Sequence, residues 1–219
     1  VNNSQVDLAF DYHQLSRFSR NPGPAHFTAI NHTLRYLKAK RDVGILIKRS
    51  DAPYHLDAMV DASFGTNPDD HKSTGGAIYF INRINPLRWR SRRQTLLATS
   101  STHAELISIN EAAEVMMDMR RFLDNMGLLT HGPSVLYTDS QPAMALLRRD
   151  SHQPVPGMSR HIAIRMLKVK EYVDSADIEL RYVRSDRNIA DIMTKAVPAP
   201  VLRAHLQRLE DGTVFDGLE

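Results

Sequence analysis

The sequence predicts an α/β fold in which a five-stranded mixed sheet is flanked by helices, with a small N-terminal helical segment. The chain has 219 residues, of which 42% are hydrophobic, so it can bury a sizeable core. Stretches in which apolar and polar residues alternate, as in strands, are interspersed with stretches of helical periodicity. The order of three strands, a helix, a strand, two helices, a strand and a helix indicates a mixed sheet.

The first part of the chain predicts the helical segment and carries a basic charge. Apolar residues recur at helical spacing from Phe27 to Leu37, after the turn-forming residues 21–24. The apolar run at residues 44–47 predicts a short strand. The first fifty residues contain eight Lys and Arg against three Asp, so this segment is basic.

Two breaks in the pattern suggest three parts of the chain. A turn-like run at residues 49–53 ends the basic segment, and we place a domain boundary there. After Pro198 a helix-like stretch at residues 201–209 is followed by a polar end with a tendency to fray. The predicted parts are residues 1–50, 51–197 and 198–219.

The middle part contains the sheet. We expect strands at residues 54–61, 76–82, 86–93, 135–138 and 178–182. We expect helices at residues 102–126, 142–147, 158–173 and 189–195. The methionines of the longest helix are interpreted as core filler rather than as metal ligands.

Composition excludes several classes of function. The absence of cysteine rules out disulfides, zinc fingers and thiol catalysis. No apolar run reaches the length of a membrane span, and no signal sequence opens the chain, so we expect no membrane partner. The first residue is Val1, and we interpret the chain as a fragment or a processed product of a longer protein.

Positive charge is concentrated in one predicted strand. The formal net charge is only +3 with a sequence pI of about 9.2, but five arginines and no acid lie between Arg83 and Arg93. Such a stripe suits a polyanion such as nucleic acid, and the alternative is a solvated strand face. Trp89 alternates out of this arginine face, which favours a place in the core.

Four carboxylates are candidates for a catalytic site, although each has an ordinary structural explanation. Asp61 ends a strand, where aspartate often forms a turn. Glu105 lies three residues after Thr102, as in a capping box. Asp139 stands where a strand meets a helix, as a cap does, and Asp191 lies in a first helical turn, where the helix dipole favours negative charge.

The combination of the four carboxylates favours a metal site. Three of them are predicted at strand ends or helix starts that one mixed sheet can bring together, and the fourth opens the last helix of the sheet domain. Carboxylates packed closely repel one another unless divalent cations lie among them. A pair of Mg²⁺ ions held by such residues can activate water on one side of a phosphate and stabilise the leaving oxygen on the other.

Around these residues the sequence resembles the RNase H domain of copia-type LTR retrotransposons. The matching segments, in the order of that family, are VDASFG at 60–65, KSTG at 72–75, SSTHAE at 100–105, YTDSQ at 137–141, RHI at 160–162 and NIADIMTK at 188–195. Upstream, LSRFSRNP at 15–22 and HTLRYLK at 32–38 resemble the segment that closes the reverse transcriptase of the same polyprotein. The resemblance implies an RNase H-like fold at 51–197 and a connection-like remnant of the reverse transcriptase at 1–50.

The resemblance also implies a role for each carboxylate. The implied enzyme is a ribonuclease H that cuts the RNA strand of RNA/DNA hybrids during reverse transcription, leaving a 5′-phosphate, and that identifies RNA by its 2′-hydroxyl. Asp61 would bridge two Mg²⁺ ions, for which Mn²⁺ is expected to substitute. Asp191 would hold the ion that activates water, and Glu105 and Asp139 the ion at the leaving oxygen. Many relatives have a second glutamate where this chain has His103, which leaves Glu105 as the helix candidate.

The expected partners are the RNA/DNA hybrid and the reverse transcriptase part of the same polyprotein. The candidate contacts with nucleic acid, for which a solvated face is the alternative, are Lys72, Ser73, Thr74, Arg88, Arg90, Arg92, Ser140, Gln141, Arg160 and His161. The expected place of action is the cytoplasm, in virus-like particles, with the nucleus as the alternative.

One departure from cellular and retroviral relatives concerns the loop before Asp191. Those relatives usually carry a histidine there that is thought to assist product release, whereas residues 184–187 of this chain read Arg-Ser-Asp-Arg. Copia-type domains commonly lack this histidine, so we expect slower turnover rather than a loss of chemistry. His161 and His152 are the candidate substitutes.

Three other interpretations compete with the nuclease. A catalytically silent RNase H-like module would bind nucleic acid or support a polymerase. A transposase or integrase core uses a similar set of acids but usually places its glutamate last, unlike Glu105. A purely structural interaction domain is the third alternative.

Overall fold

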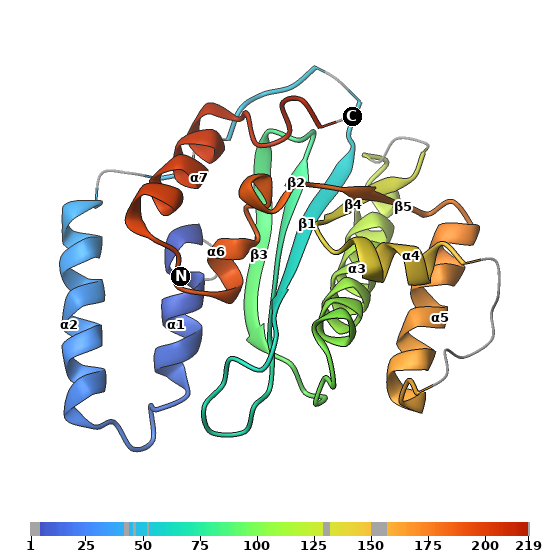
Figure 1. The fold of residues 1–219 in the computed structure, drawn as a ribbon. Coiled ribbons are helices and arrows are strands. Elements are labelled where there is room, and N and C mark those ends of the chain that lie inside the picture. Colours follow the sequence, from blue (N-terminus) through green and yellow to red (C-terminus); the bar gives the residue numbers. More distant parts are fainter. Residues whose placement is uncertain are drawn as a thin grey trace.

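In a computed structural model of the protein, five strands form one sheet in the order β3-β2-β1-β4-β5 (Figure 1). The structure describes residues 5–41, 44–45, 47–51, 53–128, 132–149 and 157–218. The strands are β1 (Leu56–Ser63), β2 (Thr74–Ile81), β3 (Asn85–Arg93), β4 (Ser134–Thr138) and β5 (Ile178–Tyr182). The β1–β2 and β2–β3 pairs are antiparallel, and the β1–β4 and β4–β5 pairs are parallel. The predicted five-stranded mixed sheet is therefore confirmed.

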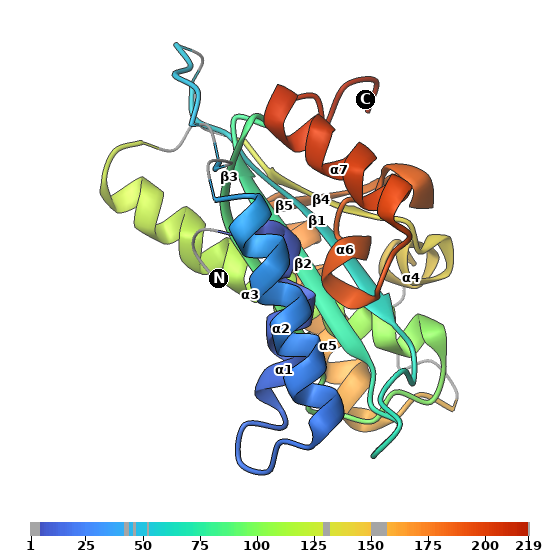
Figure 2. The ribbon, with the colours of Figure 1, turned by 90° about the vertical axis from the view of Figure 1, so that its left-hand side faces the viewer.

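Helices cover both faces of the sheet (Figures 1 and 2). On the face that we call the α3 face lie α3 (Ser101–Asn125), α4 (Gln141–Leu147) and α5 (Arg160–Asp174). On the opposite face, the α6 face, lie α1 (Ala9–Ser16), α6 (Asp191–Thr194) and α7 (Ala199–Asp211). The outer helix α2 (Pro24–Ala39) and the 3₁₀ turns η1 (Val6–Leu8) and η2 (Ser185–Arg187) complete the described helices.

Strand β1 is the centre of the fold because both of its faces are covered. Leu56, Ala58 and Val60 pack against the helices of the α3 face. Met59, pointing the other way, packs into the core of the α6 face. A strand buried on both faces places its polar residues in low-dielectric surroundings, so an ionised side chain on β1 needs a compensating partner.

The two N-terminal helices differ in how they meet the sheet. Val6 and Ala9 are buried in the core of the α6 face, and His13 of α1 accepts a hydrogen bond from the backbone N–H of Arg93 (3.0 Å). Helix α2 has no buried residue. The boundary near residue 50 stays a prediction, but α1 contributes to the core of the part that follows.

Two expectations for flanking segments were wrong. Residues 44, 45 and 47 are not in a strand, and Leu46 lies outside the described residues. The backbone of Lys48 instead exchanges hydrogen bonds with the side chain of Asn85 (2.7 and 2.8 Å), which takes the place of strand pairing.

The polar end after α7 does not fray within the described residues. Phe215 is buried and packs edge-on against Phe80 of β2 (centroids 5.0 Å apart) and near Tyr137 of β4 (5.3 Å). One aromatic side chain thus fixes the tail to the sheet. No helix in the described part of the chain is long and apolar enough to span a membrane.

Candidate metal centre

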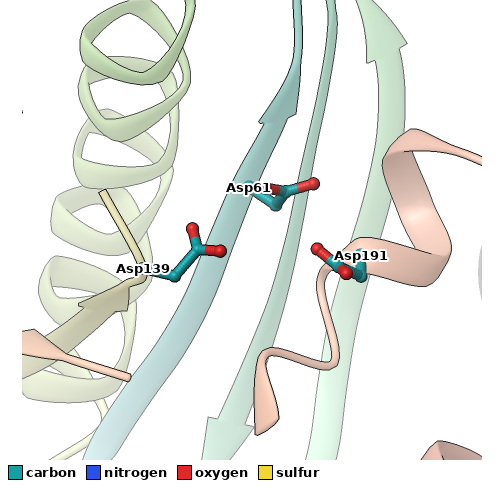
Figure 3. Close-up of side chains that lie close together, drawn as sticks. All are labelled: Asp61, Asp139 and Asp191. Carbon is teal, nitrogen blue, oxygen red and sulfur yellow. The ribbon is translucent and has the colours of Figure 1, made fainter. Parts of the chain in front are cut away.

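Three aspartates meet where the adjacent parallel strands β1 and β4 end (Figure 3). Asp61 lies on β1, Asp139 directly follows β4, and Asp191 is the first residue of α6. One carboxylate oxygen from each lies within 4.8 Å of the other two. Because parallel strands present their carboxyl ends at the same edge, the first two are brought together by the β1–β4 pairing itself.

Asp61 is the most buried of the three aspartates. It is 4% exposed, and the hydroxyl of Thr194 donates a hydrogen bond to its Oδ2. Burial raises the pKa of Asp61, and the charge of Asp139 raises it further, against the lowering effects of Thr194, Lys195 and the Ala62 N–H. The fold therefore disfavours the ionised form of Asp61 when no cation is bound.

Asp191 is held at the site by its loop and by one lysine. Asn188, fully buried, donates a hydrogen bond to the carbonyl of Val60 (2.9 Å), which ties the turn before α6 to β1. Lys195 Nζ lies 3.0 Å from Asp191 Oδ2, whereas Asp191 Oδ1 is buried without a hydrogen-bond partner among the described residues. Burial, followed by the charge of Asp61, raises the pKa of Asp191.

Glu105 approaches the aspartates from the α3 face. It lies in the first turns of α3, is 9% exposed, and its Oε2 is buried with no hydrogen-bond partner in the described part of the chain. Burial, then the charges of Asp61 and Asp139, raise its pKa to about 9. Glu105 is not in the group of mutually close oxygens, but its charge is coupled to that group.

Two adjacent glycines allow both helices to reach the sheet near the carboxylates. Gly76 pairs with Asp61, and a Cβ atom there would lie 2.5 Å from Met193 Cβ and 2.8 Å from Thr194 Cγ2 of α6. A Cβ atom on Gly75 would lie 2.5 Å from Ser108 Oγ of α3. Because neighbouring residues of a strand point to opposite faces, the pair admits α6 on one side and α3 on the other.

The ordinary explanations for three of the carboxylates are wrong. Asp61 lies inside β1, which continues to Ser63, so it does not form a turn. Helix α3 is capped by Ser100, which accepts from the His103 N–H (3.2 Å), so no capping box involves Glu105. Helix α4 is capped by Ser140, not by Asp139.

The predicted nucleic-acid contacts on β3 are placed away from the aspartates. Trp89 is 4% exposed and packs in the core of the α6 face, as expected. Because neighbouring residues of a strand point to opposite faces, every second position of β3, counted from the neighbours of Trp89, points to the α3 face; these positions include Arg88, Arg90 and Arg92. Asp61 points to the α6 face. Arg88 and Arg92 are exposed and Arg90 is half-buried.

The remaining predicted contacts divide into buried and accessible residues. Ser73 and Thr74 are buried, and Ser73 Oγ accepts a hydrogen bond from the Gly65 N–H (3.1 Å), so their side chains support the loop rather than face outward. Ser140 is half-buried as the α4 cap. Half-buried Lys72 and the exposed residues Gln141, Arg160 and His161 stay accessible.

Several residues of the site were not among the sequence candidates. Thr194 donates a hydrogen bond to Asp61, and Lys195 forms an ion pair with Asp191. The i, i+4 spacing of Asp191 and Lys195 was a sequence signal for this ion pair. In the loop that lacks histidine, the hydroxyl of Ser185 donates to Asp139 Oδ2. His161 is exposed at the start of α5, and His152 lies outside the described residues.

The donor set fits divalent cations. Clustered carboxylates, two of which keep a buried and unpartnered oxygen, offer the oxygen ligands that Mg²⁺ and Mn²⁺ prefer. Buried polar atoms are normally paired, so the unpartnered oxygens of Glu105 and Asp191 mark positions that a ligand would complete. Burial, followed by the charges of neighbouring acids, raises the pKa values of Glu105 and Asp191, and Lys195 offsets this only in part.

Comparison with known proteins gives sequence relatives and a fold. No protein-family model matches the chain. The retrovirus-related Pol polyprotein from transposon TNT 1-94 of Nicotiana tabacum is 31% identical over 195 residues, 89% of this chain, and the chain spans 14% of that polyprotein. The corresponding polyprotein from transposon RE2 of Arabidopsis thaliana is 28% identical over 192 residues, 88% of this chain and 13% of the polyprotein.

A solved structure of foamy viral protease-reverse transcriptase in complex with dsDNA aligns with a TM-score of 0.50 and 15% identity. The alignment covers 75% of this chain and 30% of that one, and a likeness at this identity concerns the fold alone. Together with the sheet order, these comparisons show an RNase H-like fold in a chain that is similar to copia/Ty1 retrotransposon Pol polyproteins over most of its own length.

Proposed function

We propose that this domain is an endoribonuclease that hydrolyses the RNA strand of RNA/DNA hybrids during reverse transcription of a retrotransposon. The observation that carries the proposal is the cluster of Asp61, Asp139 and Asp191 with Glu105 coupled to it by charge. Among the described residues, Glu105 Oε2 and Asp191 Oδ1 are buried and have no hydrogen-bond partner. An arrangement that destabilises the empty site is expected where the bound ion is part of the function.

The four carboxylates would hold two Mg²⁺ ions, and Mn²⁺ is expected to substitute. Asp61, central in the cluster, would contact both ions, Asp191 one of them, and Glu105 and Asp139 the other. Bound in this way, divalent ions activate water and stabilise the leaving oxygen of a phosphodiester. In the reaction the water oxygen joins phosphorus and the bond from phosphorus to O3′ breaks, so the products are a 5′-phosphate and a 3′-hydroxyl.

The residues of the chain position this chemistry. Thr194 orients Asp61 and Ser185 orients Asp139, each through a hydroxyl hydrogen bond to one carboxylate oxygen. Asn188 and Gly76 keep α6, and with it Asp191, against β1 and β2. Accessible cations, among them Arg88, Arg92 and Arg160, supply charge for phosphate contacts outside the cluster.

The choice of an RNA/DNA hybrid rests on the sequence relatives. Retrovirus-related Pol polyproteins match 89% and 88% of this chain, and the motifs around all four acids resemble those of RNase H domains from such elements. The polymerase part of the same polyprotein is the proposed protein partner. Helix α2, on which Phe27 and Leu34 are 57% and 55% exposed, offers an apolar surface for such a contact.

A cleavage assay tests the proposal. The purified chain is incubated with end-labelled RNA/DNA hybrid, RNA duplex or DNA duplex, in Mg²⁺ or in EDTA. We expect Mg²⁺-dependent cutting of the RNA in the hybrid alone, with 5′-phosphate ends, and loss of that cutting in Asp139→Asn. No cutting of the hybrid, or cutting that survives Asp139→Asn, would contradict the enzyme and favour a silent binding module.

A further inference from the structure

The carboxylate cluster contains a cation of its own. Lys195 Nζ lies 3.0 Å from Asp191 Oδ2. The charge of Lys195 also lowers the pKa values of Asp61 and Glu105, against the larger raising effect of burial. One ammonium group thus acts on three of the four carboxylates that the proposed metal site contains.

This contact differs from an ordinary ion pair on a helix surface. Such i, i+4 pairs lie on exposed helix faces, where solvent screening leaves them only a small contribution to stability. Here the helix ends at Thr194, and Lys195 is its C-cap with an extended backbone (φ −151°, ψ 158°). The Asp191 side chain is only 13% exposed. The carboxylate of this pair therefore lies within the cluster, whereas the pairs on a helix face have both partners in solvent.

The two partners also differ in their freedom to move. Asp191 is fixed by α6, whose approach to the sheet depends on Gly76, whereas the Lys195 side chain is 46% exposed. A flexible four-carbon stem can carry the ammonium into solvent while the carboxylate stays in place. The ammonium, 3.0 Å from Asp191 Oδ2, repels a metal ion that binds the same carboxylate, so the ion binds more tightly once the ammonium has moved away.

We propose that Lys195 is a built-in counter-cation that holds the carboxylates together in the metal-free protein and that a divalent ion must displace. The inference rests on the proposed function, because it concerns the same metal site. It assigns Lys195 two opposed effects: the residue stabilises the metal-free fold and weakens the binding of the metal. As a positioning residue it acts through Asp191 rather than on the scissile bond.

The test compares full-length Lys195→Gln and Lys195→Arg with a matched control, Lys38→Gln, which removes the same charge from an exposed position on α2. Binding of MgCl₂ and of MnCl₂ is measured by calorimetry without substrate. We expect Lys195→Gln to bind either ion about tenfold more tightly, equivalent to about 1.4 kcal/mol. Lys195→Arg and Lys38→Gln should remain near the wild type.

Thermal unfolding gives an independent measurement. In EDTA, Lys195→Gln is expected to melt about 2–4 °C below the wild type, and in excess MgCl₂ this difference should close. A Lys195→Gln variant that folds only when Mg²⁺ is present would also support the proposal. Unchanged or weaker metal binding, a melting deficit that persists in Mg²⁺, or failure to fold in both conditions would overturn the proposal.

These results are separable from the proposed nuclease activity. If the wild type binds metal and Lys195→Gln binds it more tightly, but no hybrid is cut, then the inference stands and the enzyme proposal fails. If hybrid is cut while Lys195→Gln leaves metal affinity unchanged, then the enzyme stands and the counter-cation fails.

Discussion

Asp57 and Asp61 lie on the same face of the same strand, four residues apart, and both are buried, yet their surroundings are opposite. Asp57 is fully buried and has two basic neighbours, His55 (Nδ1–Oδ2 2.8 Å) and Arg83 (Nε–Oδ1 3.4 Å). Asp61 is surrounded by Asp139, Asp191 and Glu105. At one end of β1 the protein supplies the partners of a buried carboxylate, and at the other end it supplies more carboxylates.

The difference separates a structural acid from a functional one. A buried charge is tolerated when partners within the fold satisfy it, as around Asp57. At the Asp61 end the carboxylates outnumber the nearby cations, and Lys195 is a cation whose charge favours the ionised form of Asp61. The fold therefore bears a cost at Asp61 that a ligand from outside would remove, and the two positions should respond oppositely to the same substitution.

The largest expected contrast is in catalysis. Asp61→Asn should lower the single-turnover rate of hybrid cleavage by more than about a hundredfold, since even residues that only support metal ligands cost about 10–100-fold when changed. Asp57→Asn should keep the rate within a few-fold, because Asp57 has no place in the cluster. Rates are measured on labelled hybrid in excess Mg²⁺. Equal losses of cleavage rate in the two variants would show that Asp57 and Asp61 do not differ in function.

Stability in EDTA should change in opposite directions. Asp57→Asn leaves Arg83 and His55 without their buried partner, at a cost of roughly 1–3 kcal/mol, below the usual range for a buried pair because both bases are partly exposed. Asp61→Asn removes a buried carboxylate from among like charges and should stabilise the metal-free fold. Urea unfolding measures both. Destabilisation by Asp61→Asn would show that Asp61 is structural.

The closeness of α6 to Asp61 depends on Gly76, so Gly76→Ala should disturb this end of β1 only. The new Cβ would collide with Met193 and Thr194, at a cost of about 1–3 kcal/mol, and would move Asp191 away from Asp61. We expect lower stability together with lower cleavage. Gly75→Ala is the control, because its new Cβ would meet Ser108 of α3 on the opposite face of the sheet rather than α6. Full activity in Gly76→Ala would contradict this account of the site.

Stability in the absence of metal should also depend on pH. The pKa of Glu105 is raised from 4.5 to about 9, so between these values the folded state binds more protons than the unfolded state. In EDTA, stability should therefore fall as the pH rises from about 4.5 towards 9, and Glu105→Gln should reduce the slope. Excess Mg²⁺, which favours ionised carboxylates, should reduce it as well. Urea midpoints measured across this range provide the check.

Local pattern was sufficient for most of the sheet and for the acids. Leu56, Ala58 and Val60, at alternate positions, indicated β1. The sequence motifs contain Asp61, Asp139 and Asp191, whose carboxylates the fold brings together. The catalytic roles and the nucleic-acid contacts stay predictions.

What local pattern missed depends on tertiary approach. The contact of Thr194 with Asp61 arises because Gly76 lets α6 close on β2, and no spacing within α6 contains that information. The same holds for Phe215, a single aromatic residue in a polar tail, which becomes core only through Phe80 and Tyr137. In α2, periodicity identified an apolar face but not whether anything covers it.

The most direct test of the central claim is where a divalent ion binds. Crystals of the chain grown with MnCl₂ would locate the ion by anomalous scattering, and the account predicts density among Asp61, Asp139 and Asp191, with none beside Asp57. The same density should be lost in Asp61→Asn and retained in Asp57→Asn. Manganese bound elsewhere, or a cluster that stays empty at saturating concentration, would contradict it.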